Sequence, residues 1–304
     1  MWKAVLGIAL LIFIAAEGHA QEPLEPRHVL QVAESVNRTL EKMAAANLSP
    51  LPPPHIDVTA ACQPRHVLVK VFEALLQLQL LRRLHGLKLR PLPQLPPREP
   101  LMEDVKQAVD TLQTDIIELA EVFGVEPVQV SLPLRADALP EDVFNAVSRT
   151  VDLINALDVP PIAPNTVYRM VETIIAVIEE IRGVRNITAA PALSEASGTA
   201  PEDSYMAARE LLQQLERLTV KHPDFDIPGK VVIPPQPEGP IEPAHVIDIL
   251  GIILAELSAI KVKHGIDSVT TLAREQSGHL PAHIFSRLTH AGALLDTLQL
   301  EQQE

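Results

Sequence analysis

A short motif that recurs at a nearly constant spacing constrains this chain more than any other feature. Four segments begin with proline and carry histidine two residues later, and four others keep the frame with Asp or Thr at the third place. The segments begin at Pro26, Pro64, Met102, Pro140, Pro164, Pro201, Pro243 and Pro281. The first four starts are 38 residues apart each time, and the later ones follow at intervals of 24, 37, 42 and 38. This regularity indicates an internal repeat, so each segment is expected to begin the same structural unit.

The apolar residues that follow each start have the period of an α-helix. They recur about 3, 7, 10 or 11, 14 and 17 residues after the start, as in Val167, Val171, Ile174, Ile178 and Ile181. Proline suits the first helical position, where its missing N–H would have no partner in any case. Glycines that follow basic residues predict helix ends, because glycine adopts the left-handed conformation and cations favour the C-terminus. These glycines are Gly86, Gly183 and Gly265.

Proline-rich stretches separate the predicted helices. The chain has 28 prolines, roughly twice the usual share of about 5%, and they gather in 51–54, 91–100, 191–201 and 234–243. Such sequence favours extended chain that rises about 3.1 Å per residue, so 15 residues reach about 46 Å. A helix of about 18 residues is only about 27 Å long. The linkers are therefore long enough to run back along a helix, and consecutive helices need not be antiparallel. A short extra helix is also expected within 267–276.

The predicted fold is all-α, with eight repeated long helices joined by extended proline-rich linkers. Only the connection over 158–163 is short, and the four starts on either side of it correspond with offsets of 137 to 141 residues. We therefore expect two four-helix units, at 21–160 and 161–304. One continuous array of eight helices is the alternative.

Residues 1–20 have the pattern of a secretory signal peptide. Lys3 precedes a continuous apolar run, and small residues stand at Gly18 and Ala20 before a cleavage site. An uncleaved anchor is the alternative. The most apolar later run, 247–260, is interrupted by Asp248 and Glu256, so no transmembrane segment is expected after cleavage. The sequence predicts an exported protein, either periplasmic or extracellular.

Composition excludes several classes of function. The net charge of −14 makes the phosphate backbone of a nucleic acid an unfavourable partner. A single cysteine rules out an internal disulfide framework. The sequence has no nucleophile elbow, no His-Glu-x-x-His, no phosphate-binding glycine loop and no Cys-x-x-Cys. We therefore do not expect an enzyme.

The third residue of each motif is interpreted as a helix cap. With proline at the first helical position, this residue is the third, where a side-chain acceptor can reach back to a free backbone N–H. A neutral imidazole can accept such a bond through one nitrogen. The eight predicted caps are His28, His66, Asp104, Asp142, Thr166, Asp203, His245 and His283.

The histidines also raise the possibility of a metal or haem site, because helical bundles build such sites from inward side chains. The candidates near the C-terminus are His279, His283 and His290. Pro281 interrupts a helix between the first two, which spoils an i, i+4 pair of ligands. No metal and no cofactor are therefore expected.

Two further features have a structural and a functional interpretation. Aromatic rings recur four residues after a start, at Phe144, Tyr168, Tyr205 and Phe285, where they either pack in the core or line a groove for a ligand or partner. Cys62 lies two residues before a start, where an apolar residue packs against the first turn of the helix. Burial as a small apolar side chain is favoured there over a reactive thiol.

The expected function is a non-catalytic protein-binding or scaffolding module, since helical repeats present extended surfaces. The partner is another protein or a second copy of the chain. The alternative is a small-ligand or cofactor-binding bundle, with the ligand between the helices of one unit.

Overall fold

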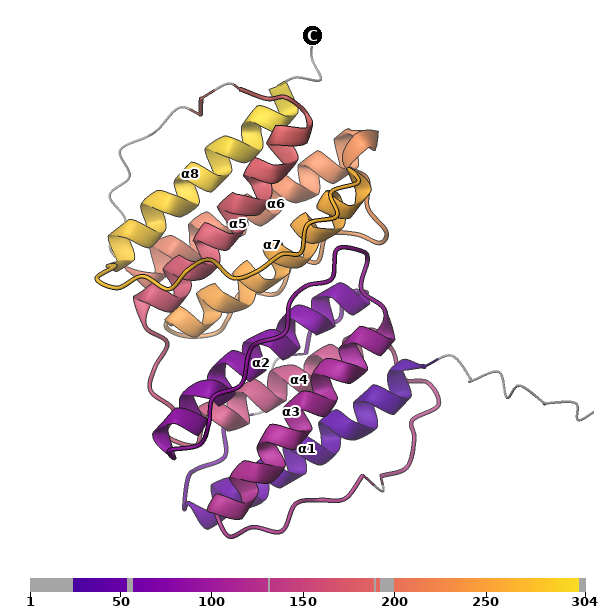
Figure 1. Ribbon diagram of the computed structural model, residues 1–304, viewed down its shortest axis with the longest axis vertical. Coiled ribbons are helices and arrows are strands. Elements are labelled where there is room, and N and C mark those ends of the chain that lie inside the picture. The colour runs from indigo at the N-terminus through magenta and orange to yellow at the C-terminus, as the bar shows by residue number, and fades with distance from the viewer. Residues whose placement is uncertain (1–23, 54–56, 131, 189, 192–199, 301–304) are drawn as a thin grey trace, which may run out of the picture.

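The fold is all-helical in the part of the chain that the computed structural model describes, residues 24–53, 57–130, 132–188, 190–191 and 200–300. These residues form eight α-helices, one short 3₁₀ helix and no β-sheet (Figure 1). The helices are α1 (Pro26–Ala46), α2 (Pro64–Leu84), α3 (Met102–Val122), α4 (Pro140–Asn155), α5 (Pro164–Val184), α6 (Pro201–Lys221), α7 (Pro243–Lys263) and α8 (Pro281–Leu300), with η1 (Pro223–Phe225) after α6. The predicted fold class is confirmed. The predicted signal peptide lies outside the described residues.

Each α-helix begins at the residue that starts a sequence repeat, and left-handed residues follow several helix ends. Gly86 and Gly265 have φ of 69° and 68° just after α2 and α7. Gly183 was predicted to end α5, which is wrong. The helix continues to Val184, and Asn186 takes the left-handed conformation with φ of 59°. A short polar side chain allows asparagine this conformation.

The helices pack in two sets of four (Figure 1). In the first set α1 and α2 each contact α3 and α4, and in the second α5 and α6 each contact α7 and α8. Contact between α2 and α7 joins the sets. The connectivity is the same in both halves, in line with the sequence repeat. The division into domains at residues 160 and 161 stays a prediction.

Neighbouring helices within a set run in the same direction. Gln79 Nε2 donates to Asp115 at 3.4 Å, and one turn further along both helices Arg82 Nη2 donates to Glu118 at 2.8 Å, so α2 and α3 are parallel. Paired contacts of the same kind show that α1 and α4 are parallel, through Asn37 with Ala146 and Asn47 with Asp158. They also show that α5 and α8 are parallel, through Glu172 with Arg287 and Arg182 with Thr297. Across the junction of the two sets, α2 and α7 are antiparallel, because Arg65 bonds Glu256 whereas Lys70 bonds Asp248.

Extended linkers return the chain along the helices. The linker before α2 runs against α4, where Arg149 donates to the carbonyl of Pro52 at 3.0 Å and the N–H of Val58 donates to Asn145 at 2.9 Å. The linker before α8 runs back along α5 in the same way. Its residues Ser268, Ala273 and His279 bond Glu180, Thr173 and Asn165. This path lets consecutive helices point the same way.

The core consists mainly of aliphatic side chains, to which all eight α-helices contribute. Helices α2 and α7 lie where the two sets meet and are buried around most of their circumference. Apolar residues on every side of a helix are typical of such a central position. The apolar run 247–257 is thus covered by the chain itself. None of the helices in the described residues combines the length and apolarity needed to cross a bilayer.

Candidate functional site

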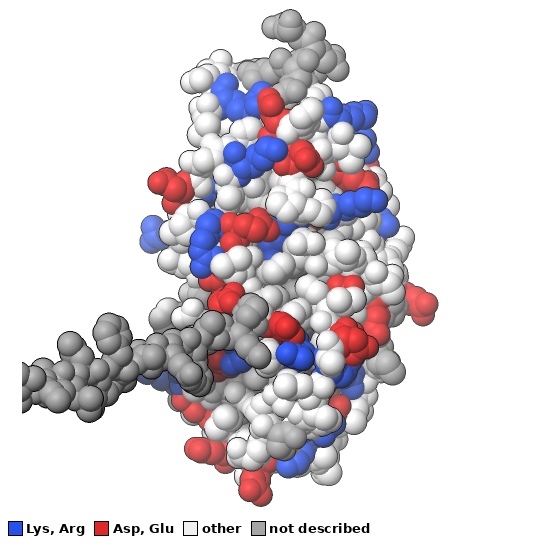
Figure 2. Space-filling model, turned by 90° about the vertical axis from the view of Figure 1, so that its right-hand side faces the viewer, with Lys and Arg blue, Asp and Glu red and all other residues white. Residues whose placement is uncertain are grey.

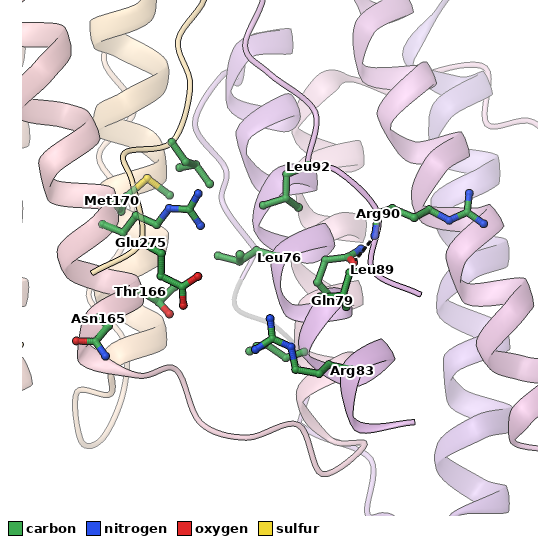
Figure 3. A pocket seen from close by; sticks show the side chains of 13 residues that line it. Leu76, Gln79, Arg83, Leu89, Arg90, Leu92, Asn165, Thr166, Met170 and Glu275 are labelled. Atoms are coloured by element: carbon green, nitrogen blue, oxygen red, sulfur yellow. Dashed lines mark hydrogen bonds between the residues drawn. The ribbon is translucent and has the colours of Figure 1, made fainter. Parts of the chain in front are cut away.

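A cleft of about 200 Å³ lies between the two sets of helices. One wall is formed by the C-terminal half of α2 and the linker after it, and the other by the start of α5 and the linker before α8 (Figure 3). Leu76 and Leu92 face Met170 across this space (Figure 3). The cleft differs from the expected site, which was placed between the helices of a single unit.

The inner end of the cleft continues into a small apolar pocket of about 40 Å³. Both spaces share Leu76, Leu92, Met170 and Leu272 in their walls, so the pocket is the floor of the cleft. Its other side chains include Val69, Phe72, Leu95, Leu254 and Glu73. The cleft therefore changes from a polar mouth to an apolar interior that contains one carboxyl group.

Two extended linkers form part of the wall of the inner pocket. Leu95 and Thr270 make an isolated antiparallel β-bridge between the linker after α2 and the linker before α8. The short helix expected within 267–276 is therefore wrong, because this segment is extended. The N–H of Ala273 donates to Thr173 of α5, and Thr270 pairs with Leu95 of the linker after α2, so the segment does not bond within its own backbone as a helix would.

Glu73 belongs to a buried charged cluster behind the pocket. Lys70 Nζ donates to Glu73 Oε2 at 2.9 Å and also to Asp248 of α7. Burial raises the pKa of Glu73 well above its usual range, and the charge of Asp248 acts in the same direction. Burial alone would lower the pKa of Lys70, but Asp248 and Glu73 raise it. Burial and Asp248 therefore favour the protonated form of Glu73, whereas its two acidic neighbours favour the charged form of Lys70. Its Oε1 has no hydrogen-bond partner among the described residues.

The mouth of the cleft carries arginines from both walls. Arg83 extends from α2 toward α5 (Figure 3), and Arg169 of α5 lines the opposite wall. Arg169 Nε donates to the carbonyl of Ala273 at 2.5 Å, which leaves its terminal nitrogens for other partners. Arg90 points away from the cleft (Figure 3) and pairs with Asp115 and Glu118. Glu275 is the acidic residue at the mouth.

A second buried polar network joins the start of α2 to α7. Arg65 Nε and Nη2 donate to Glu256 Oε2 at 3.1 and 2.9 Å, and both side chains are almost completely buried. Glu256 Oε1 accepts from the backbone N–H of Val232 at 3.0 Å and lies 2.9 Å from His66 Nε2. Arg65 Nη1 also donates to Glu99 at 2.8 Å. Both carboxylate oxygens of Glu256 are thus satisfied, as a buried ion pair requires.

The tautomer of His66 follows from its two partners. The backbone N–H of Gln63 lies 2.8 Å from His66 Nδ1, so this nitrogen is the acceptor. We therefore assign the proton to Nε2, which donates it to Glu256. His66 acts both as a helix cap and as a donor to the ion pair. The predicted capping role covers only the first of these functions.

Seven of the eight predicted cap residues accept a hydrogen bond from the backbone N–H three residues earlier. They are His28, His66, Asp104, Asp142, Asp203, His245 and His283, at distances of 2.8 to 3.2 Å. Thr166 makes no such bond to a described residue, and α5 has no acidic residue in its first turn. Among the eight predicted caps, the third residue of α5 is thus the one that accepts no such hydrogen bond from a described residue. The start of this helix lines the cleft.

The candidate metal ligands are placed as follows. The ring of His279 stacks on Tyr168 with centroids 3.4 Å apart, and it meets His283 edge-on at 5.8 Å. His283 Nδ1 is engaged by the N–H of Leu280. His290 lies two turns further along α8, where burial first and Arg287 second lower its pKa. In the part of the chain that is described, no group of three His, Cys, Asp or Glu side chains is arranged to hold a metal ion.

The four aromatic residues do not form one groove. Phe144 and Tyr205 are buried in the core, whereas Tyr168 and Phe285 are half-buried. Tyr168 stacks on His279, and Phe144 lies 5.6 Å below Lys70 Nζ. None of the four lines the cleft or its inner pocket.

Cys62 is buried just before α2, and this environment makes a testable prediction about its reactivity. Burial raises the pKa of its thiol to about 12, helped by Glu141 and Glu256. Because the thiolate is the reactive form, we expect a thiol reagent to label the native protein at pH 8 many times more slowly than the protein in denaturant. Labelling at equal rates in both states would contradict the buried position.

The sequence motifs did not identify the residues of the cleft. Leu76 and Met170 belong to apolar stripes that look like ordinary core, and Arg83 lies in the last turn of α2, where a basic residue is common. The sequence feature that could have indicated the buried charges is a charged residue within an apolar run, such as Asp248 in 247–260.

On the surface shown in Figure 2, acidic and basic side chains are interspersed without one continuous basic stripe. No protein-family model matches the chain, and no curated protein and no solved structure is significantly similar to it.

Proposed function

We propose that this chain is an exported, non-catalytic binding protein that holds a small ligand in the cleft between α2 and α5. The observation that carries the proposal is the continuous path from a polar mouth to an apolar floor. Ligand pockets combine an apolar lining with a few polar groups that fix the orientation of the ligand. Arg83, Arg169 and Asn165 are such groups at the mouth.

The volume of the cleft limits the size of the ligand. About 200 Å³ is below the range of about 300–1,000 Å³ that is usual for drug-sized molecules. An apolar cavity of about 150 Å³ is known to hold benzene. A single-ring compound or a short aliphatic chain therefore suits the space, whereas a haem is too large for it.

Two features favour this function over the scaffolding role that the repeat suggests. The widest apolar run, 247–257, is covered within the chain and offers no surface to a partner. The exposed large apolar residues are dispersed, for example Leu48, Leu134 and Val220 on different elements, and isolated residues of this kind are normal on protein surfaces. Binding of another protein or of a second copy is the alternative proposal.

The test is to identify what the cleft contains and then to fill it. Native mass spectrometry of the purified protein should show a bound small molecule that is released on denaturation. The substitution Leu92→Trp places a larger side chain in both the cleft and its floor, and it should abolish retention of the molecule. Leu134→Trp, in an exposed linker position outside the cleft, is the matched control and should retain it.

Circular dichroism and light scattering of both variants establish that the fold and oligomeric state are unchanged. Absence of a bound molecule in the wild type, or equal retention by both variants, would contradict the proposed function. A stoichiometric protein complex that both variants form equally well would favour the scaffolding alternative.

A further inference from the structure

We propose that the ligand of this cleft is a small carboxylic acid, bound as its anion, with a single ring or short chain as its apolar body. The inference rests on the proposed function and adds the chemical class of the ligand. The carboxylate would lie at the mouth between Arg83 and Arg169, and the apolar body would point toward Met170 and Leu272.

The first argument is the state of the arginines. Several arginines of this protein form ion pairs with nearby acidic residues, as Arg90 does with Asp115 and Glu118. Arg83 and Arg169 form no ion pair with a described acidic residue, yet they line the same cleft from opposite walls. A guanidinium group presents paired donors that match the geometry of a carboxylate. Two of them on facing walls give an anion a defined position.

The start of α5 adds to the attraction for an anion. Asn165 and Thr166 of its first turn line the mouth, and no acidic residue occupies that turn. The N-terminus of a helix carries partial positive charge from its aligned peptide dipoles. At α3, by contrast, Asp104 accepts the N–H of Leu101 and supplies a negative charge of its own. The first turn of α5 therefore brings no anion of its own to the mouth, where the acidic side chain is Glu275 of the linker before α8.

The floor suits the apolar part of an anion. Its walls are aliphatic and aromatic, and its one acidic side chain is Glu73. Glu73 is almost completely buried and its Oε1 is unpartnered in the described residues. Burial and Asp248 raise its pKa, which favours the protonated form, and Lys70 Nζ donates to its Oε2 at 2.9 Å, so its repulsion of a second carboxylate is reduced. The negative charge that does oppose the ligand is Glu275 at the mouth.

Isothermal titration calorimetry with three probes of similar shape tests the inference. Phenylacetate is the anion, phenylacetamide its neutral counterpart and benzylamine a cation. At low ionic strength we expect phenylacetate to bind at least about tenfold more tightly than either of the others, in keeping with the strength of charge-assisted hydrogen bonds. The preference should weaken as salt is added.

Variants assign the preference to the mouth. The double substitution Arg83→Gln and Arg169→Gln should remove the preference for the acid, whereas Arg38→Gln, at an exposed position on α1, should leave it unchanged. Glu275→Gln should strengthen binding of phenylacetate. If the amide or the amine binds as tightly as the acid, or if the double variant keeps the preference, the inference is overturned while the proposed function stands. If none of the three probes binds, the inference is also overturned, and the retention experiment with Leu92→Trp decides the proposed function separately.

Discussion

Replacing Glu256 with alanine is expected to lower the free energy of unfolding by about 3–5 kcal/mol, because it leaves a buried charge without its partner. Arg65 would lose both hydrogen bonds to Glu256 Oε2 in a place that water does not reach. His66 Nε2 and the N–H of Val232 would lose their acceptor at the same time. Urea denaturation followed by circular dichroism measures the change.

A surface ion pair is the matched control. Arg217 and Glu210 lie 2.6 Å apart with both side chains about half exposed, and such pairs contribute about 0–1 kcal/mol. Glu210→Ala should therefore change stability by less than about 1 kcal/mol. Comparable losses for Glu256→Ala and Glu210→Ala would show that the buried network is not important for stability.

The contribution of Glu256 should also depend on pH. Burial alone would raise its pKa, but the bonds from His66, Arg65 and Val232 outweigh burial and hold the pKa below the ordinary value of 4.5. A depressed pKa in the folded state means that the ionised carboxylate stabilises the fold above the pKa of the unfolded chain. This contribution is lost as pH falls through the folded-state pKa. The difference in stability between the wild type and Glu256→Gln should therefore shrink on acidification.

Replacing Phe225 with alanine should lower the free energy of unfolding by about 3–5 kcal/mol, the usual range for removing a buried phenylalanine. Phe225 lies in η1 and is completely buried. Its ring meets that of His264 edge-on at a centroid distance of 5.0 Å, and the guanidinium carbon of Arg185 lies 5.0 Å from its centre. The residues that directly follow α5 and α7 thus both contact the ring that η1 supplies.

Phe285→Ala provides the comparison for this substitution. Phe285 is only half-buried on α8, so less apolar area returns to water and no closed cavity is left. Its loss should be clearly smaller, about 1–2 kcal/mol. Thermal unfolding monitored by circular dichroism gives both values. Equal effects would mean that η1 is not a fixed part of the core.

The helices were predictable from the sequence because their signals are local. Proline at the first position, an acceptor two residues later and the apolar period all lie within one repeat, and they locate the start of each helix. Cys62 was interpreted from its neighbours in the same way. These features depend on the geometry of a single helix, which does not change with the arrangement around it.

The cleft and the two charged networks were not predictable because they depend on contacts between distant segments. Arg65 and Glu256 are 191 residues apart in the chain. Arg65 looked like an ordinary polar residue at a helix start, and Glu256 like an interruption of an apolar run. Their pairing follows from the antiparallel contact of α2 and α7, which no local pattern specifies. The extended form of 267–276 was missed because its partners lie on α5 and on the linker after α2.

The parallel direction of neighbouring helices has a consequence for the speed of folding. Bonds between contacting helices join residues that are far apart in sequence, from 36 residues between Gln79 and Asp115 to 191 between Arg65 and Glu256. A bundle of antiparallel hairpins makes its first contacts across short turns, whereas here each contact requires closure of a long loop. Folding rates fall as the mean separation of contacting residues rises. This chain should therefore fold more slowly than an up-and-down helical bundle of the same length.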